Sequence, residues 1–272
     1  MEEILRHLQP GAFLLDLGCS HGSFNKKSTC ATVVRFDREA QLGSHELFVR
    51  GDAAALPFRD RTFTAIVANH SLEHFENLNG ALREIGRVIH PTGMLFVSVP
   101  DASTLTDKLY RWLARGGGHV NAFTAAADIA AEIERATGLQ HVATRVLCSS
   151  LSFLNRRSSP RPRPRRLILL GAGYEWSLLL YTWLSRRIDR LLNLRTSVYG
   201  WALYFGEIPE PIDTSPHVNV CIRCGSGFPA SLIQELHLRG LALPGMRRYR
   251  CPQCAAPNTF TKDWPIDSHG ST

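Results

Sequence analysis

The segment Leu14–Phe24, which reads LLDLGCSHGSF, decides how the first part of the chain folds. It begins as a short apolar run of the kind that forms a buried strand. Gly18 and Gly22 follow, and glycine permits backbone conformations and a close approach of ligand that a side chain would block. A glycine turn at the carboxyl end of a strand is where a doubly wound sheet binds nucleotides. We therefore expect a ligand site at this turn, although plain tight turns are also rich in glycine.

Similar short runs, apolar or β-branched and bounded by Gly, Pro, Asp or Asn, predict further strands. With the first strand included, they cover residues 12–17, 32–37, 47–52, 63–69, 94–100 and 198–205. Apolar residues at helical spacing predict a helix over Glu73–Ile89, which the turn His90–Gly93 ends. Thr124 and Gly138 are typical of the first and last positions of another helix. Strands that alternate with helices predict an α/β fold with a mostly parallel sheet.

Two acidic residues lie at the ends of the next predicted strands. Asp37 ends the second strand, 21 residues after Asp16. An ionised carboxylate at this place can accept hydrogen bonds from both hydroxyls of a ribose. Asp52 ends the third strand and is followed by Ala53, and an acid there can meet the amino group of an adenine. Together with the glycine turn, these residues predict a cofactor that contains a nucleoside.

From about residue 10 to 150 the chain resembles the class I S-adenosylmethionine-dependent methyltransferases, and among them the group similar to ubiquinone/menaquinone-biosynthesis methyltransferases. The matching segments are Asp16–Gly22, Asp37, Gly51–Ala53, Leu56–Phe58, Phe63–Val67, Ser71–His74 and Arg87–Gly93. They are specific for fold and cofactor and carry almost no information on the methyl acceptor. Ser20 replaces a usual glycine, and His90–Gly93 replaces the usual Lys-Pro-Gly-Gly. The short N-terminus lacks most of a helix that covers the cofactor in this family.

The resemblance implies a Rossmann-like methyltransferase sheet, mostly parallel with an antiparallel last strand, and S-adenosylmethionine as the cofactor. The glycine turn would surround the methionine part, Asp37 would hold the ribose, and Asp52 with Ala53 would hold the adenine. Asn69 and His70 would lie beside the sulfonium. The cofactor-binding residues predicted in this way are Asp16, Gly18, Cys19, Gly22, Asp37, Asp52, Ala53 and Asn69.

Methyl transfer from a sulfonium is an in-line displacement, to which an enzyme contributes mainly orientation. A base is needed only where the acceptor must lose a proton, as a sugar or phenol hydroxyl would. The candidate catalytic residues are His70, His74 and His119, with Glu73 and Asp101 as further possible bases. Each also has a structural interpretation. Glu73 and His74 would open the helix predicted from residue 73, and His119 would pack against a neighbouring aromatic ring.

Four cysteines form two close pairs, Cys221/Cys224 and Cys251/Cys254. Two C-x-x-C knuckles place four thiolates around a tetrahedron, which is the geometry that zinc prefers. We predict a structural zinc ribbon with these four residues as its ligands. A closed site of four cysteines leaves no open position on the metal, so the zinc should not be catalytic. Disulfides, a redox C-x-x-C and an iron–sulfur cluster are the alternatives.

The region 154–196 interrupts the alternation of strands and helices. Asn155–Arg166 is rich in arginine and proline and predicts an extended, solvated arm, which could also bind the phosphates of RNA or of anionic lipids. Leu167–Leu184 is strongly apolar. It reaches the lower length limit of a membrane span, but Glu175 and two glycines weaken that interpretation. A helix on the bilayer surface, a lid over an apolar substrate and an ordinary core helix remain open.

The motifs and the changes in composition along the chain predict a methyltransferase domain over residues 1–207, with an insert at 154–196, and a zinc-ribbon domain over 217–263. The net charge of +7 suits an anionic partner without identifying one. Seven cysteines, an odd number, and an N-terminus without signal-peptide features predict a cytoplasmic protein, with peripheral contact to the inner face of the membrane through 154–196.

Three functions compete at this point. The first is O- or C-methylation of a small-molecule or lipid-linked acceptor. The second is an RNA methyltransferase that binds its substrate with the ribbon and the arginine arm. The third is a non-catalytic zinc-ribbon interaction protein.

Overall fold

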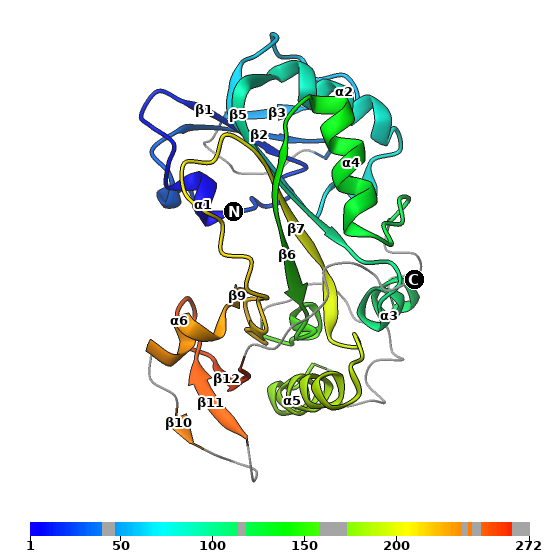
Figure 1. The fold of residues 1–272 in the computed structure, drawn as a ribbon, viewed down its shortest axis with the longest axis vertical. Coiled ribbons are helices and arrows are strands. Elements are labelled where there is room, and N and C mark those ends of the chain that lie inside the picture. The colour runs from blue at the N-terminus through cyan, green and yellow to red at the C-terminus, as the bar shows by residue number, and fades with distance from the viewer. Residues whose placement is uncertain (40–46, 114–117, 158–172, 236–238, 241–245, 263–272) are drawn as a thin grey trace.

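The computed structural model describes residues 1–39, 47–113, 118–157, 173–235, 239–240 and 246–262. Its main element is a seven-stranded sheet in the order β3-β2-β1-β4-β5-β7-β6 (Figure 1). The strands are β1 (Phe13–Leu17), β2 (Thr32–Asp37), β3 (Leu47–Arg50), β4 (Phe63–Asn69), β5 (Ile89–Pro100), β6 (His141–Cys148) and β7 (Val198–Gly206). The first five are parallel, whereas β7 runs antiparallel to both β5 and β6. The predicted mostly parallel sheet with an antiparallel last strand is therefore confirmed.

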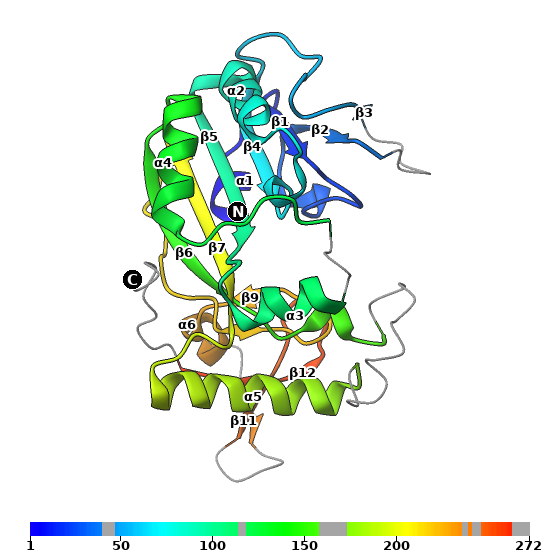
Figure 2. The same ribbon diagram turned by 90° about the vertical axis from the view of Figure 1, so that its right-hand side faces the viewer.

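Both faces of the sheet are covered, which is why its central strands are continuously apolar. Leu15 and Leu17 point to one face, where they meet α2 (Leu78–Val88) and α4 (Ala126–Thr137). Leu14 points to the other face, where the short helix α1 (Glu2–Leu5) supplies Ile4 and Leu5. Figure 2 shows α2 and α4 together on one side of the sheet. The alternation of side chains along each strand thus divides the core into two layers.

Three boundaries around α2 and α4 differ from the sequence prediction. Residues 73–77 do not open α2: Leu72–His74 forms a separate 3-10 turn, η2, and the amide oxygen of Asn77 caps α2 by accepting the Gly80 N–H at 2.9 Å. His90–Gly93 is no turn but part of β5, which begins at Ile89. The cap of α4 is Ala125 rather than Thr124. Gly138 does end α4, with a φ of 72°.

The remaining short elements of the first 160 residues connect the sheet to its surroundings. They are η1 (Lys26–Ser28), α3 (Leu105–Leu113) and η3 (Ser152–Leu154). Helix α5 (Glu175–Leu192) precedes β7. Residues 158–172, which hold most of the predicted arm and the start of the predicted apolar segment, lie outside the described residues. Among the helices that the structure does describe, none has the length and apolarity needed to cross a membrane.

The C-terminal part consists of small sheets around the cysteine pairs. Its elements are β8 (Asn219–Val220), β9 (Gly227–Phe228), α6 (Ala230–Glu235), β10 (Arg239–Gly240), β11 (Arg247–Arg250) and β12 (Pro257–Phe260). It lies beside α5 at the lower end of β6 and β7 in Figure 1, and α5 contacts β12. The side chain of Ile222 is fully buried in an apolar cluster with Leu151, Leu154 and Leu178. The predicted division into domains at 207–217 stays a prediction, and the two parts share a buried interface.

Arg186 of α5 occupies the centre of this interface. Its side chain is buried, with 2% of the residue exposed. The guanidinium donates to three backbone carbonyls: Ser149 O after β6 at 2.8 Å, Ser197 O before β7 at 3.2 Å and Val218 O before β8 at 3.1 Å. Because a buried carbonyl without a partner costs about 1–3 kcal/mol, this one side chain stabilises three chain segments at once.

We expect Arg186→Met to lower the free energy of unfolding by about 3 kcal/mol or more, since methionine keeps much of the volume but leaves these carbonyls unpaired. Denaturant unfolding followed by circular dichroism measures this change. Arg190→Met, an exposed position on the same helix, is the matched control and should change stability by less than about 0.5 kcal/mol. Equal effects of the two substitutions would contradict the role given to Arg186.

Candidate active site and cysteine cluster

A cavity of about 740 Å³ lies at the carboxyl ends of β1, β2 and β4. This volume is within the range of sites for cofactor-sized ligands. One part of its wall comes from the N-terminal half of the sheet and includes Gly18, Asp37, Asp52, Ala53 and His70. The rest comes from the end of β6 and the residues after it, from Tyr110, His119 and Tyr199, and from the C-terminal residues Val220, Gly225 and Gly227.

The glycine turn is held in place by the neighbouring strand. The N–H groups of Gly18 and Cys19 both donate to Phe36 O, at 2.8 and 3.1 Å. Gly18 has a φ of +68°, and a Cβ there would stand 2.4 Å from the Cβ of Ser71. A side chain at position 18 would therefore collide with the segment that follows β4. The requirement for glycine thus comes from packing as well as from the backbone conformation.

Asp37 faces the cavity from the end of β2, whereas Asp52 faces it from two residues after β3, which ends at Arg50 and not at Asp52 as predicted. The Asp37 carboxylate accepts the Ser20 N–H at 2.7 Å and the Glu39 N–H at 3.0 Å. The Asp52 carboxylate accepts the Ala54 N–H at 2.9 Å. These bonds orient both side chains and leave further lone pairs for a ligand. Two oriented carboxylates beside a glycine turn fit the ribose and adenine of S-adenosylmethionine, which these residues would hold.

Four predicted cofactor residues lie next to the cavity without lining it: Asp16, Cys19, Gly22 and Asn69. Asp16 is fully buried and accepts the Ser23 N–H at 3.0 Å. Burial raises the pKa of the Cys19 thiol to about 12, so it stays neutral. Asn69 accepts a hydrogen bond of 2.7 Å from Ser98 Oγ in β5. Whether these residues contact the cofactor stays a prediction.

Arg35 is a residue of this region that the sequence interpretation missed. Its guanidinium fills the space beside Gly22, where a Cβ would lie 2.4 Å from Nη1. Nη1 also donates to His21 O at 3.3 Å, and Nε lies 4.0 Å from Asp16 Oδ2. A single basic residue inside the apolar strand β2 was the available signal, because such a side chain needs an acidic or carbonyl partner nearby.

Of the three histidines predicted as catalytic, His74 and His119 line the other part of the cavity, and His70 lines it between the two parts, beside Ser71. The rings of His74 and His119 lie 4.9 Å apart, and His70 Nδ1 lies 3.9 Å from Glu73 Oε1. The His70 side chain keeps 32% of its surface accessible on the cavity that it lines, and desolvation lowers its pKa to about 4. Burial raises the pKa of Glu73, which is 1% exposed, to about 8. The cluster joins ionisable groups from η2 and from the segment after α3.

Asp101, the remaining possible base, is fully buried and does not line the cavity. Its carboxylate accepts the N–H of Ser103 at 2.9 Å, and Arg195 Nη2 lies 3.2 Å away. These contacts link the end of β5 to the segment before β7. They give Asp101 a structural explanation, while a catalytic role for any of the histidines stays a prediction.

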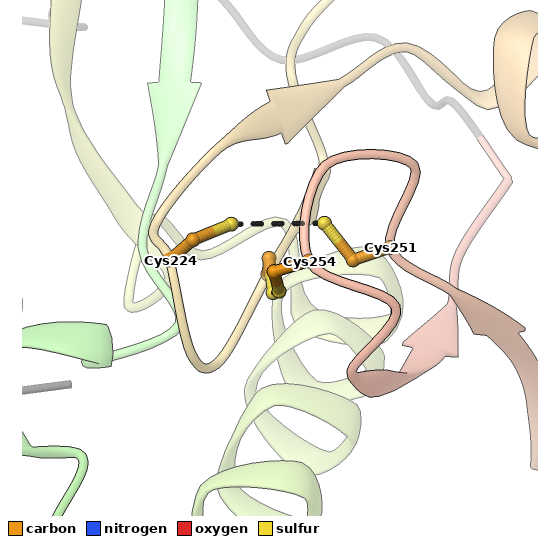
Figure 3. Close-up of side chains that lie close together, drawn as sticks. Cys224, Cys251 and Cys254 are labelled. Atoms are coloured by element: carbon orange, nitrogen blue, oxygen red, sulfur yellow. Dashed lines mark hydrogen bonds between the residues drawn. The ribbon is translucent and has the colours of Figure 1, made fainter. Parts of the chain in front are cut away.

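The four paired cysteines also come together. Their sulfur atoms all lie within 4.8 Å of one another, and Figure 3 shows three of these side chains converging from two loops. The Cys221–Cys254 and Cys224–Cys251 sulfur separations are 3.5 and 3.6 Å. These distances are close to about 3.8 Å, the edge of a tetrahedron with Zn–S bonds of about 2.3 Å. The donor set and the spacing therefore fit a structural zinc ion and not a pair of disulfides.

The two knuckles have matching backbones. Cys221 N–H donates to Ser226 O and Gly225 N–H to Cys221 O, at 2.9 and 3.0 Å. In the second knuckle Cys251 N–H donates to Ala256 O and Ala255 N–H to Cys251 O, both at 2.9 Å. Gly225 and Ala255 occupy the same left-handed position, with φ of 79° and 57°. This internal symmetry is what two C-x-x-C turns around one tetrahedral ion require.

The sheet order, the glycine turn and the carboxylates beside it define the class of protein: a Rossmann-like, S-adenosylmethionine-dependent methyltransferase. Comparison with known proteins agrees. A family model described as "Methyltransferase domain" matches residues 15–97. The malonyl-[acyl-carrier protein] O-methyltransferase of Methylococcus capsulatus is 31% identical over 192 residues, which are 60% of this chain and 70% of that protein. The chain belongs to the S-adenosylmethionine-dependent methyltransferases, and it is an enzyme rather than a non-catalytic interaction protein.

Other relatives share a shorter part. The sterol 24-C-methyltransferase of Schizosaccharomyces pombe is 30% identical over 106 residues, covering 33% of this chain and 28% of that protein. "Probable tRNA methyltransferase 9B" of Bos taurus is 30% identical over 111 residues, covering 36% and 24%. Among solved structures, a SAM-dependent methyltransferase from Archaeoglobus fulgidus is 15% identical with a TM-score of 0.49, covering 74% of this chain and 87% of that one. This chain spans less than a third of the sterol and tRNA relatives.

We expect Asp37→Ala to weaken binding of S-adenosylmethionine about 100-fold, because a charged acceptor of two hydroxyl hydrogen bonds is lost. Isothermal titration calorimetry with the cofactor and with its demethylated product measures this. Asp128→Ala, an exposed carboxylate of α4, is the control and should bind as the wild type does. No detectable binding by the wild type, or equal binding by Asp37→Ala, would contradict the assignment.

We expect the purified chain to contain about one zinc ion and Cys251→Ser to contain almost none, because three thiolates hold the ion far less tightly than four. Elemental analysis of both proteins gives the metal content. Cys30→Ser, an exposed cysteine outside the cluster, should retain the metal. Unchanged zinc in Cys251→Ser would refute the ribbon.

Proposed function

We propose that this enzyme methylates an oxygen atom of a small acceptor group that is carried on a lipid or on a carrier protein. The observation that carries the proposal is the division of the cavity into two parts. Asp37, Asp52 and Ala53 line one part and suit the nucleoside. The other part is lined by ionisable side chains, hydroxyl groups and apolar residues, which suit a polar head group on an apolar or extended carrier.

The C-terminal ribbon supports this assignment because it completes the acceptor part. Val220, Gly225 and Gly227 of the ribbon line the cavity together with Ser152 and Phe153. The ribbon is fixed there by buried hydrogen bonds: Ser150 Oγ donates to Cys221 O at 3.0 Å, and Asn155 Nδ2 donates to Ile222 O at 2.8 Å. A rigid wall of this kind selects acceptors by shape, so we infer that the zinc is structural and acts on specificity.

His70 is the residue that we propose as the base. It follows β4 and lines the cavity. The next residue, Ser71, packs against Gly18, so His70 lies between the two parts of the cavity. Its φ of +53° is unusual for a residue other than glycine, and strain of this kind gathers at functional sites. Bound S-adenosylmethionine supplies the electrophilic methyl group. Where the acceptor is a hydroxyl, the imidazole accepts its proton, and Glu73, 3.9 Å away, stabilises the charged ring when ionised; a malonyl carboxylate has no proton to lose and needs no base.

The acceptor named for the Methylococcus relative gives the first compound to test, a malonyl thioester on a carrier protein. The chain should be incubated with S-adenosylmethionine labelled with ¹³C in the methyl group and with malonyl-carrier protein, malonyl-coenzyme A or a total lipid extract. The NMR shift of the transferred carbon separates O-methyl from C- and N-methyl products. We expect an O-methyl signal with at least one of them. Label on carbon or nitrogen alone, or no transfer to any of the three, would contradict the proposal.

If the acceptor that this assay identifies is a hydroxyl, we expect His70→Asn to lower kcat about 100-fold or more while the Kd for the cofactor stays unchanged, whereas methylation of a malonyl carboxylate should not depend on this base. Asparagine tolerates the left-handed backbone at this position, so the fold should be preserved. His90→Asn, an exposed histidine at the start of β5, is the control. A kcat equal to that of the wild type would exclude His70 as the base.

RNA is the second candidate acceptor, favoured by a groove between α5 and the ribbon. Arg187, Arg190, Arg247 and Lys262 line it with Trp183 and Phe260, and cations beside aromatic rings suit a phosphate backbone with stacked bases. Binding of bulk tRNA that weakens steeply with salt, together with methylation of that RNA, would support this candidate. Binding without methylation would leave the first proposal in place.

A further inference from the structure

We propose that Glu73, His74 and His119 form a binding site for a divalent metal ion in the acceptor part of the cavity, separate from the cysteine cluster. One ligand atom from each of the three residues lies within 4.8 Å of the other two. All three residues line the cavity. The site goes beyond the proposed function, since neither the fold nor methyl transfer itself requires a metal.

The first reason is the state of Glu73. This carboxylate is 1% exposed, and Oε2 is a buried oxygen that makes no hydrogen bond to any residue the structure describes. A buried polar atom without a partner is costly and calls for an explanation. A cation held by the Glu73 carboxylate together with the two neighbouring imidazoles would supply such a partner.

The second reason is how the two histidines are oriented. His74 Nδ1 lies 2.9 Å from the backbone oxygen of Gly118, and His119 Nδ1 lies 3.2 Å from Asp107 Oδ1. Metal-binding histidines almost always direct one ring nitrogen to a carbonyl or a carboxylate and the other to the metal. His74 Nδ1 is hydrogen-bonded to a carbonyl and His119 Nδ1 faces a carboxylate oxygen, so in both rings the nitrogen that would bind the metal is Nε2. Asp107 is in turn held by Arg111 Nε at 2.5 Å.

The third reason is that the backbone joins the two ligand segments. The N–H groups of Val120 and Asn121 donate to Glu73 O at 2.8 and 3.1 Å. The Asn121 side chain donates to Leu72 O and Phe75 O, at 2.9 and 2.8 Å. Side chains from η2 and from the segment after α3 are therefore held together before any ion binds. Such preorganisation lowers the entropic cost of binding.

Two imidazoles and one carboxylate favour a transition metal such as Mn²⁺, Fe²⁺ or Zn²⁺ over Mg²⁺ or Ca²⁺, which prefer oxygen ligands alone. Three protein ligands leave coordination positions open toward the cavity. If the proposed function holds, those positions suit an acceptor with two neighbouring oxygens, such as a β-dicarbonyl or a vicinal diol. A bound cation would then orient the acceptor and favour its deprotonated form.

The test measures binding of Mn²⁺ alone, without cofactor or acceptor, by the loss of the free-ion signal in electron paramagnetic resonance. Mn²⁺ is a hard ion and competes poorly for the thiolates of the cysteine cluster. We expect the wild type to bind about one Mn²⁺ and Glu73→Gln and His74→Asn to bind it at least about 100-fold more weakly. Asp107→Asn should weaken binding about 10–100-fold, as expected for a residue that only orients a ligand.

His90→Asn is the matched control and should bind Mn²⁺ as the wild type does. His74 is exposed, so its replacement should preserve the fold, which circular dichroism and the zinc content of each variant verify. Absence of Mn²⁺ binding by the wild type, or equal binding by folded His74→Asn, would overturn the proposal. Because no acceptor is present, failure of the proposed function would not affect these outcomes.

Discussion

The bonds of one buried arginine hold the acceptor part of this enzyme in place. Arg186 donates to carbonyls that belong to three separate chain segments, one of which leads into the ribbon. Hydrogen bonds from a charged donor are among the strongest available inside a protein, and their loss leaves the accepting carbonyls unpaired. The wall formed by η3 and the ribbon depends on this contact, and so does the shape of the cavity that the wall closes.

The sheet and the cofactor side were predictable because their residues are local in sequence. Glycine at positions 18 and 22 and acids at the ends of consecutive strands obey spacing rules, and β2 and β4 were predicted with their observed bounds. The errors around Glu73–Asn77 have a physical cause. The apolar spacing continues through that segment, but the side chain of Asn77 provides a cap that starts the helix later. The apolar periodicity alone does not show where a side-chain cap begins a helix.

The acceptor side was much less predictable, because its contacts join residues far apart in sequence. His119 was one of several candidate bases, and nothing local indicated that it would lie beside Glu73 and His74. The cysteine spacing predicted the ribbon but not its place against η3. Arg186 looked like one member of a basic run, and only the fold distinguishes it from its exposed neighbours Arg187 and Arg190.

The distance in sequence between the two parts of the cavity also has a consequence for biosynthesis. The residues that suit the cofactor all precede Phe75, whereas the acceptor wall needs Val220, Gly225 and Gly227. Its buried bonds join positions 71 and 67 residues apart. Contacts of such separation form late, and domains fold from the N-terminus during synthesis. On the ribosome, the surface suited to the methyl donor can thus form well before the wall that selects the acceptor is complete.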